Sequence, residues 1–369
     1  MELIARQPDI LRELELLQGV VERKNTVPIL SHLLLSISGE GLEVMGTDLE
    51  VSVRSRSSVT VKKEGAVCVA AKKLYEIIRL LPEKDVVIKS DSENWVSVVC
   101  DRSRFRVMGL PKEDFPTLPT AGKSAKIKIP GPVLKKLIER VIFAVTSDDA
   151  RFALNGALMI LKDRTITLVS TDSHRLCHAS ETTDLKGPAE EERALVPRKA
   201  LMELMRLGQG LDGDVYFTRK ENNLFFEVGN AVLSSRVLEG TFPNFEKVIP
   251  VGNDKIVEFD RKELTTALNR VSLLANERSR AVRLAVKDGS AEFSSKNPEM
   301  GEASEAIEVS FQGDPIEIGF NSKYLLDFLA VVATDRIQID LKDDVTQGVL
   351  RPAGDESRNY TYVVMPMRL

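Results

Sequence analysis

The chain has 369 residues, of which 43% are hydrophobic, which is enough for two or three domains with their own cores. Its 51 Lys and Arg against 55 Asp and Glu leave a formal charge of −4, so it lacks the overall basic charge that nucleic-acid-binding domains usually carry. Aromatic residues are only 5% of the chain, which argues against a protein that stacks unpaired bases.

The cysteines and the N-terminus indicate the compartment. Cys68, Cys100 and Cys177 are far apart and form no CxxC pair, which argues against a disulfide framework or a zinc site. Residues 1–14 contain acids and no long apolar run, unlike a signal peptide, and no run of 18 apolar residues is present. We therefore expect a cytoplasmic protein without a membrane partner.

Six segments have the apolar spacing of α-helices, and they form two sets of three. The first set covers residues 8–21, 132–145 and 260–275, and the last of these begins at Asp260, a residue type that caps helices. The second set begins at residues 71, 198 and 322. Corresponding positions in the second set carry a lysine and, four residues later, an acid: Lys72 and Glu76, Lys199 and Glu203, Lys323 and Asp327.

A predicted β-hairpin lies between the two helices of each pair. The hairpins read LLLSISGEGLEVM, ALMILKDRTITLV and RLAVKDGSAEF, with alternating apolar residues around a turn that contains Gly or Asp. They lead into GTDLEVSVR at 46–54, STDSHRLCHA at 170–179 and SSKNPEMGEA at 294–303. Within these, Thr47, Thr171 and Ser295 are spaced by 124 residues in both steps.

A proline-containing segment closes each copy: FPTLP at 115–119, FPNFEKVIP at 242–250 and the terminal MPMRL. Pro116, Pro243 and Pro366 are 127 and 123 residues apart. We therefore predict an α+β chain of three tandem copies of one domain, each with two helices and antiparallel sheets. The predicted boundaries are 1–122, 123–250 and 251–369.

The TDSHRL segment at 171–176 suggests two chemical alternatives. A hydrolase would combine Asp172, Ser173 and His174, but adjacent strand residues point to opposite faces and could not share a proton. A metal could bind Asp172, His174 and His178 on one face of a regular strand, although no other histidine is nearby. Because the chain also lacks a phosphate-binding loop, we expect no catalytic residue, no metal and no cofactor.

The order of motifs resembles the bacterial sliding clamps, the β subunits of DNA polymerase III. The resemblance runs from end to end, through NTVPILSHLLL, GTDLE, LNGAL, STDSHRL, VPRKALMELMR, FPNFEKVIP, IGFNSKYLLDFL and YVVMPMRL. It implies a head-to-tail homodimer, a closed six-domain ring whose helices line a hole around double-stranded DNA. Such a clamp catalyses nothing; it slides on DNA and gives the polymerase processivity in replication.

The resemblance also implies a groove between the second and third domains that binds short peptides. Its partners would be the catalytic subunit of DNA polymerase III, the clamp loader, and other polymerases and repair proteins that carry a Gln with bulky apolar residues. Methionines suit such a surface because they adapt to several partners. The implied residues are Leu154, Gly156, Thr171, Ser173, His174, Arg175, Leu176, Pro243, Val248, Asn321, Tyr324, Val345, Met365, Pro366, Met367 and Arg368.

Two further surfaces follow from the resemblance. Basic residues would face DNA phosphates without reading bases, as a sliding ring requires, although those on the predicted helices also fit ordinary solvated helix faces. They are Arg23, Lys24, Lys72, Arg79, Lys136, Arg151, Arg198, Lys199 and Arg206. The ring joint would use Arg104, Phe105, Val107, Leu273, Leu274, Glu277 and Arg278, of which the apolar four also fit a domain core.

A second function remains open at this point: a peptide-binding scaffold of the same fold that does not encircle DNA. Such a protein would be a monomer in solution and would still bind the motif peptides.

Overall fold

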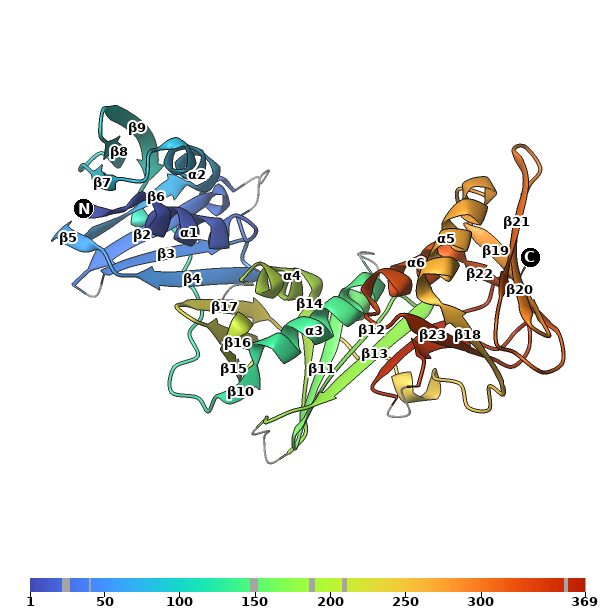
Figure 1. The fold of residues 1–369 in the computed structure, drawn as a ribbon. Helices are drawn as coiled ribbons and strands as arrows, with labels where there is room; N and C mark the ends of the chain where they lie inside the picture. Colours follow the sequence, from blue (N-terminus) through green and yellow to red (C-terminus); the bar gives the residue numbers. More distant parts are fainter. Residues whose placement is uncertain are drawn as a thin grey trace. The chain divides into compact units, whose positions relative to one another are not determined.

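The computed structural model describes residues 1–21, 27–39, 41–146, 152–185, 190–207, 211–354 and 358–368 (Figure 1). No helix among these residues is long and apolar enough to cross a membrane. The described α-helices are α1 (Gln7–Leu17), α2 (Ala71–Leu80), α3 (Gly131–Val141), α4 (Arg198–Arg206), α5 (Arg261–Val271) and α6 (Ser322–Val331).

All six predicted helices are confirmed, but the first set ends earlier than the apolar pattern suggested. Short 3₁₀ turns, Ile142–Ala144 and Ser272–Leu274, replace the last predicted turns of α3 and α5. Such turns are common at helix C-termini, where the final carbonyls lack α-helical partners. The predicted cap of α5 is confirmed, because the Asp260 carboxylate accepts backbone N–H bonds from Lys262 and Glu263.

The described chain divides into two compact units. Unit 1 comprises Met1–Lys135, Asp184–Gly187 and Val196–Val237. It contains a 13-stranded sheet in the order β10-β15-β16-β17-β4-β3-β2-β6-β9-β8-β7-β1-β5, and its helices α1 and α2 pack against each other (Figure 1). The strands are β1 (Glu2–Arg6), β2 (His32–Ser38), β3 (Gly41–Thr47), β4 (Val51–Ser57), β5 (Thr60–Lys63), β6 (Gly65–Ala70), β7 (Asp85–Ser90), β8 (Trp95–Cys100), β9 (Ser103–Leu110), β10 (Ile127–Pro130), β15 (Asp214–Lys220), β16 (Asn223–Val228) and β17 (Ala231–Arg236).

Unit 2 comprises Lys136–Thr183, Pro188–Leu195 and Leu238–Leu369. It contains an eight-stranded sheet in the order β14-β11-β12-β13-β25-β24-β23-β18 and a four-stranded sheet in the order β21-β20-β19-β22. The strands are β11 (Gly156–Lys162), β12 (Thr165–Thr171), β13 (Arg175–Thr182), β14 (Glu192–Pro197), β18 (Lys255–Asp260), β19 (Ala281–Lys287), β20 (Ser290–Asn297), β21 (Gly301–Glu308), β22 (Ile316–Asn321), β23 (Arg336–Leu341), β24 (Gly348–Pro352) and β25 (Tyr360–Val364).

The three predicted hairpins are confirmed as β2–β3, β11–β12 and β19–β20. The strand that follows a hairpin then pairs with a strand from the next predicted copy: β4 with β17, and β13 with β25. Each long sheet therefore continues past a predicted domain boundary. For this reason the two units cut across the three predicted domains, whose boundaries stay a prediction.

The backbone corrects the predicted alignment of the terminal MPMRL. Arg236 donates its N–H to the carbonyl of Glu50 at 3.1 Å, and Met365 donates its N–H to the carbonyl of His174 at 2.9 Å. Because Glu50 and His174 are corresponding turn residues, Met365 corresponds to Arg236. Pro366 therefore follows a strand end and is not the counterpart of the proline in FPNFEKVIP. The alignment of Pro366 with Pro243, based on similar spacing between prolines, was wrong, because residue spacing does not show which strands pair.

The third hairpin anchor is also shifted by one residue. Ser295 Oγ donates to the carbonyl of Val271 at 2.7 Å, at the end of α5. The matching bond in the second copy comes from Ser170 Oγ to the carbonyl of Val141 at 2.7 Å, at the end of α3. Ser295 therefore corresponds to Ser170 and not to Thr171.

Candidate functional site

The TDSHRL segment forms a tight turn between β12 and β13. Thr171 Oγ1 donates to the carbonyl of Arg175 at 2.6 Å and accepts the Ser173 N–H at 3.1 Å. Asp172 Oδ1 accepts the N–H groups of His174 and Arg175, both at 3.0 Å. Ser173 has φ 76°, a left-handed conformation that these hydrogen bonds hold in place.

This turn changes the argument about chemistry at Asp172, Ser173 and His174. The sequence-based argument placed these residues on a strand, but they lie between β12 and β13. The alternation of side chains along a strand therefore does not apply to them. Asp172 is instead an acceptor for its own turn and for an arginine, and His178 stacks on Phe245 with ring centroids 5.9 Å apart. Within the part of the chain that the structure describes, no group of three or more His, Cys, Asp or Glu side chains could hold a metal ion.

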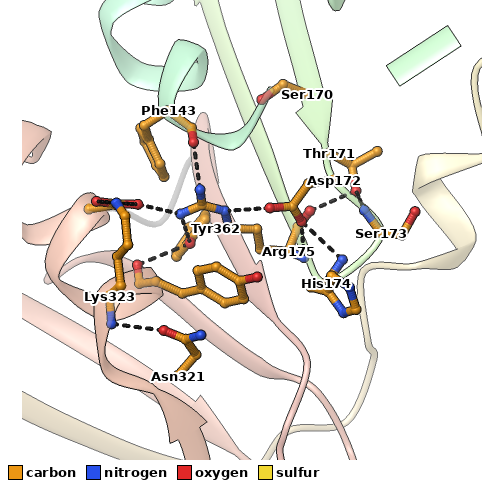
Figure 2. A network of polar contacts seen from close by, with 12 residues as sticks. Phe143, Ser170, Thr171, Asp172, Ser173, His174, Arg175, Asn321, Lys323 and Tyr362 are labelled. Carbon is orange, nitrogen blue, oxygen red and sulfur yellow. Dashed lines mark hydrogen bonds and ion pairs between the residues drawn. The ribbon is translucent and has the colours of Figure 1, made fainter. Parts of the chain in front are cut away.

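Arg175 joins this turn to α6 (Figure 2). Its side chain is buried, with 8% exposed, and its Nε donates to Asp172 Oδ2 at 2.9 Å. One terminal nitrogen donates to Asp327 Oδ2 at 2.7 Å, and the other donates to the carbonyl of Phe143 at 2.6 Å. The guanidinium also lies over the ring of Tyr324, 4.4 Å from its centroid. A buried cation is thereby paired with two carboxylates and stacked on an aromatic ring.

Aromatic packing supports this cluster from β25. Phe328 of α6 stacks on Tyr362 with ring centroids 5.3 Å apart, and Phe143 meets the same tyrosine edge-on at 5.3 Å. Burial raises the pKa of Tyr362 well above its ordinary value, so its hydroxyl keeps its proton. It donates that proton to the backbone carbonyl of Tyr324 at 3.0 Å.

The C-terminal segment lies where several elements of unit 2 meet. Val364, the last residue of β25, pairs with Arg175 of β13 on one side and with Gly348 of β24 on the other. The chain then leaves this sheet, and Met367 donates its N–H to the carbonyl of Gly319 in β22 at 2.8 Å. Beyond Pro366 the chain therefore pairs with the other sheet of unit 2.

The predicted groove residues all belong to unit 2, and they differ in exposure. Asn321 caps α6 by accepting the N–H of Lys323, and Phe245, packed on His178, anchors the segment that carries Pro243 and Val248. Exposed members are Ser173, His174, Pro243, Val345 and Arg368; half-buried members are Val248, Asn321, Tyr324, Met365, Pro366 and Met367; buried members are Leu154, Gly156, Thr171, Arg175 and Leu176. The exposed and half-buried members could contact a ligand, whereas the buried ones shape the surface.

The predicted DNA-facing residues that the structure describes mostly have nearby partners. Arg23, Lys24 and Arg151 lie outside the described residues. Lys199 pairs with the buried carboxylate of Asp48, and Arg206 pairs with Glu203 at 3.2 Å. Lys136 pairs with Glu181 at 2.5 Å, Lys72 lies 3.9 Å from Glu76, Arg79 lies over the Tyr75 ring, and Arg198 is half-buried. These basic side chains are therefore partly compensated by partners within the chain.

Comparison with known proteins accounts for the whole length of the chain. Three family models match it: the DNA polymerase III beta subunit N-terminal domain over residues 1–119, the central domain over 128–244 and the C-terminal domain over 246–368.

The chain belongs to the DNA polymerase III beta subunit family.

Individual members of this family agree with that assignment. The curated "Beta sliding clamp" of Pseudomonas putida is 37% identical, and the match covers 100% of both chains. The solved DNA polymerase III subunit beta of Pseudomonas aeruginosa has a TM-score of 0.95 at 35% identity, and the sliding clamp of that organism bound to griselimycin has a TM-score of 0.93 at 36% identity. Both matches cover 100% of each chain. The fold is therefore an α+β clamp fold of three tandem domains.

The predicted ring-joint residues of this clamp are largely at the surface. In β9, Phe105 is 38% exposed, Arg104 is exposed and Val107 is half-buried. After α5, Leu273 is 75% exposed and Leu274 is half-buried, so neither is a core residue. Glu277 and Arg278 are exposed beside them.

Several residues that support the candidate groove were not among its predicted members. Asp172 and Asp327 bind Arg175, Tyr362 supports Tyr324, and Gly319 receives the terminal segment. The sequence contained one signal for Asp172: the Thr171-Asp172 pair repeats the Thr-Asp pair of GTDLE. The ion pair with Asp327 gave no such signal, since its two residues are far apart in the sequence.

Proposed function

We propose that this chain forms a ring around duplex DNA, slides along it and tethers DNA polymerase III through the groove of unit 2. The observation that carries the proposal is the match of the whole chain to the DNA polymerase III beta subunit family. The clamp supplies a mobile anchor and no catalysis. Processivity would follow because a closed ring leaves DNA only when it opens.

The pairing pattern of the repeats supports a head-to-tail homodimer. Inside the chain, β4 pairs with β17 and β13 pairs with β25. In the third copy, the strand that corresponds to β4 and β13 is β21. Among the described strands, β21 pairs with β20 on one side. The counterpart of β17 and β25 is β9, whose residues 103–108 pair only with β8 among the described strands. A second copy would complete the series by placing its β9 against β21.

Charge and apolar surface at these two edges are complementary. Strand β9 presents exposed Arg104 and Arg106, whereas β21 presents exposed Glu302 and Glu308. The exposed Leu273 lies just before Leu274, which lies next to Gly301 at the start of β21. Association of β9 with β21 would cover exposed apolar groups and bring opposite charges together.

The groove supports peptide partners of the kind that polymerases carry. Half-buried Met365 and Met367 and the Tyr324 ring offer adaptable apolar surface beside exposed polar residues such as His174. The main polymerase, the clamp loader and repair proteins would compete for it. A solved relative bound to griselimycin shows that a clamp of this family binds a further molecule.

Retention on DNA tests the encirclement. The protein would be loaded by its clamp loader with ATP on a circular duplex, which is then cut with a restriction enzyme. A ring should stay on the circle and slide off the linear product. Retention after linearisation would contradict encirclement, and failure to load, together with a monomeric state and intact peptide binding, would favour the non-encircling scaffold.

A further inference from the structure

The predicted groove contains an arginine whose charged group is already engaged inside the protein. Each nitrogen of the Arg175 guanidinium donates to a protein acceptor: Asp172, Asp327 together with Tyr362, and the carbonyl of Phe143. With 8% of its side chain exposed, Arg175 offers little to a peptide. The hydrogen bonds and burial of Arg175 indicate that it supports the predicted groove from beneath and does not contact a ligand directly.

Two residues of α6, Tyr324 and Asp327, contact the Arg175 guanidinium. Asp327 follows Tyr324 by three residues, so both side chains lie on one face of the helix. Asp327 bonds Arg175 at 2.7 Å while the Tyr324 ring stacks on the same guanidinium. Tyr324 is half-buried, so part of its side chain reaches the surface at the predicted groove. Arg175 thus ties the position of Tyr324 to the 171–175 turn.

The other unit contains a link of the same kind built from different residues. There the turn carboxylate is Asp48, the counterpart of Asp172, and it pairs directly with Lys199 of α4. Residue 51, the counterpart of Arg175, is Val, and residue 200, the counterpart of Tyr324, is Ala. Both units therefore join the Thr-Asp turn to the second helix of the following copy. Only unit 2 inserts an arginine that also carries an aromatic ring.

We propose that Asp327 is a positioning residue for the peptide groove: through its ion pair with Arg175 it holds α6 against the 171–175 turn and keeps Tyr324 in place for a bound peptide. The proposal rests on the peptide-binding function proposed above. Asp327 itself need not touch the peptide, because it acts through Arg175 and Tyr324.

A double-mutant cycle between Asp327 and Tyr324 tests this role. The probe is a fluorescein-labelled hexapeptide with a Gln and two bulky apolar residues, titrated by fluorescence polarisation against the full chain. Asp327→Asn should raise Kd about tenfold, because it removes one charge partner of a buried cation. Tyr324→Ala should weaken binding as well. The double variant should bind no more weakly than Tyr324→Ala alone, because both changes remove the same contact.

Two controls separate positioning from general damage. Lys323→Met removes the other partner of Asp327, an exposed lysine at 2.6 Å, and should leave Kd unchanged. Glu76→Gln changes the corresponding helix carboxylate of the first copy, which pairs with Lys72 and Lys73, and should also leave Kd unchanged. Additive losses in the double variant, or unchanged binding by Asp327→Asn, would overturn the positioning role. If the wild-type chain does not bind the probe at all, the proposed peptide groove fails instead.

Discussion

Met365 donates its backbone N–H to the carbonyl of His174 at 2.9 Å, which ties the C-terminal segment to the Thr-Asp turn. The matching bond in unit 1 joins Arg236 to Glu50 at 3.1 Å. In unit 1 the chain continues beyond this position into another element. In unit 2 the segment crosses to the other sheet, and Met365 and Met367 remain half-buried.

Deletion of the residues after Val364 should therefore strongly weaken the proposed peptide binding and leave the proposed dimer intact. The truncation removes Met365 and Met367 from the groove but keeps β25 paired with β13 and β24. We expect Kd for a labelled motif peptide to rise by about 30-fold or more, as for loss of an interface hot spot. Sedimentation should still report the wild-type mass. Unchanged peptide binding would contradict the groove assignment.

Leu273→Asp should weaken the proposed homodimer. The side chain is 75% exposed in the single chain, and its 3₁₀ turn, Ser272–Leu274, contacts β21, the edge strand of its sheet. Placing a carboxylate in an apolar joint, next to the glutamates of β21, should raise the dimer dissociation constant by about 30-fold or more. Analytical ultracentrifugation over a dilution series measures it. Leu80→Asp, at a similarly exposed leucine of α2, is the control, and equal behaviour of the two variants would argue against this joint.

Asn230→Ala should destabilise unit 1. Glu13 is buried on α1, and Asn230 Nδ2 donates to both of its carboxylate oxygens, at 3.1 and 3.3 Å, while Ser55 donates to one of them. Removing the amide leaves a buried carboxylate with fewer donors, which costs about 1–3 kcal/mol. Chemical denaturation measures the free energy of unfolding. The same change at Asn223, a half-buried residue of the adjoining strand, should have a smaller effect; equal losses would show that the Glu13 network contributes little.

Unit 2 should lose stability on mild acidification through His178. Burial lowers the pKa of this histidine below its ordinary value of 6.5, so the folded state holds it neutral. The unfolded chain therefore binds the proton more readily, and stability should fall as the pH drops below about 6.5. Thermal melting at pH 7.5 and 5.5 measures the effect. His178→Phe, which keeps a ring against Phe245, should reduce the difference between the two pH values; an unchanged difference would contradict the assignment.

Local patterns in the sequence determined the helices, the hairpins and their threefold repetition. Apolar spacing at i, i+3 and i+4, together with alternation around short turns, depends only on neighbouring residues, so it can be read without a structure. The start of α5 at Asp260 shows this most directly, because a cap acts within one helical turn.

Only the tertiary structure decided which strands of different copies pair and what the groove contains. Pairing of β13 with β25 aligns Met365 with Arg236. The proline spacing in the sequence had aligned the terminal segment with FPNFEKVIP instead, which was wrong. The ion pair of Arg175 with Asp327 joins residues 152 positions apart. The energy of such contacts comes from burial and charge pairing between distant segments, and no periodicity along the chain encodes it. The repeated sequence therefore determined the building block, and long-range packing determined the site.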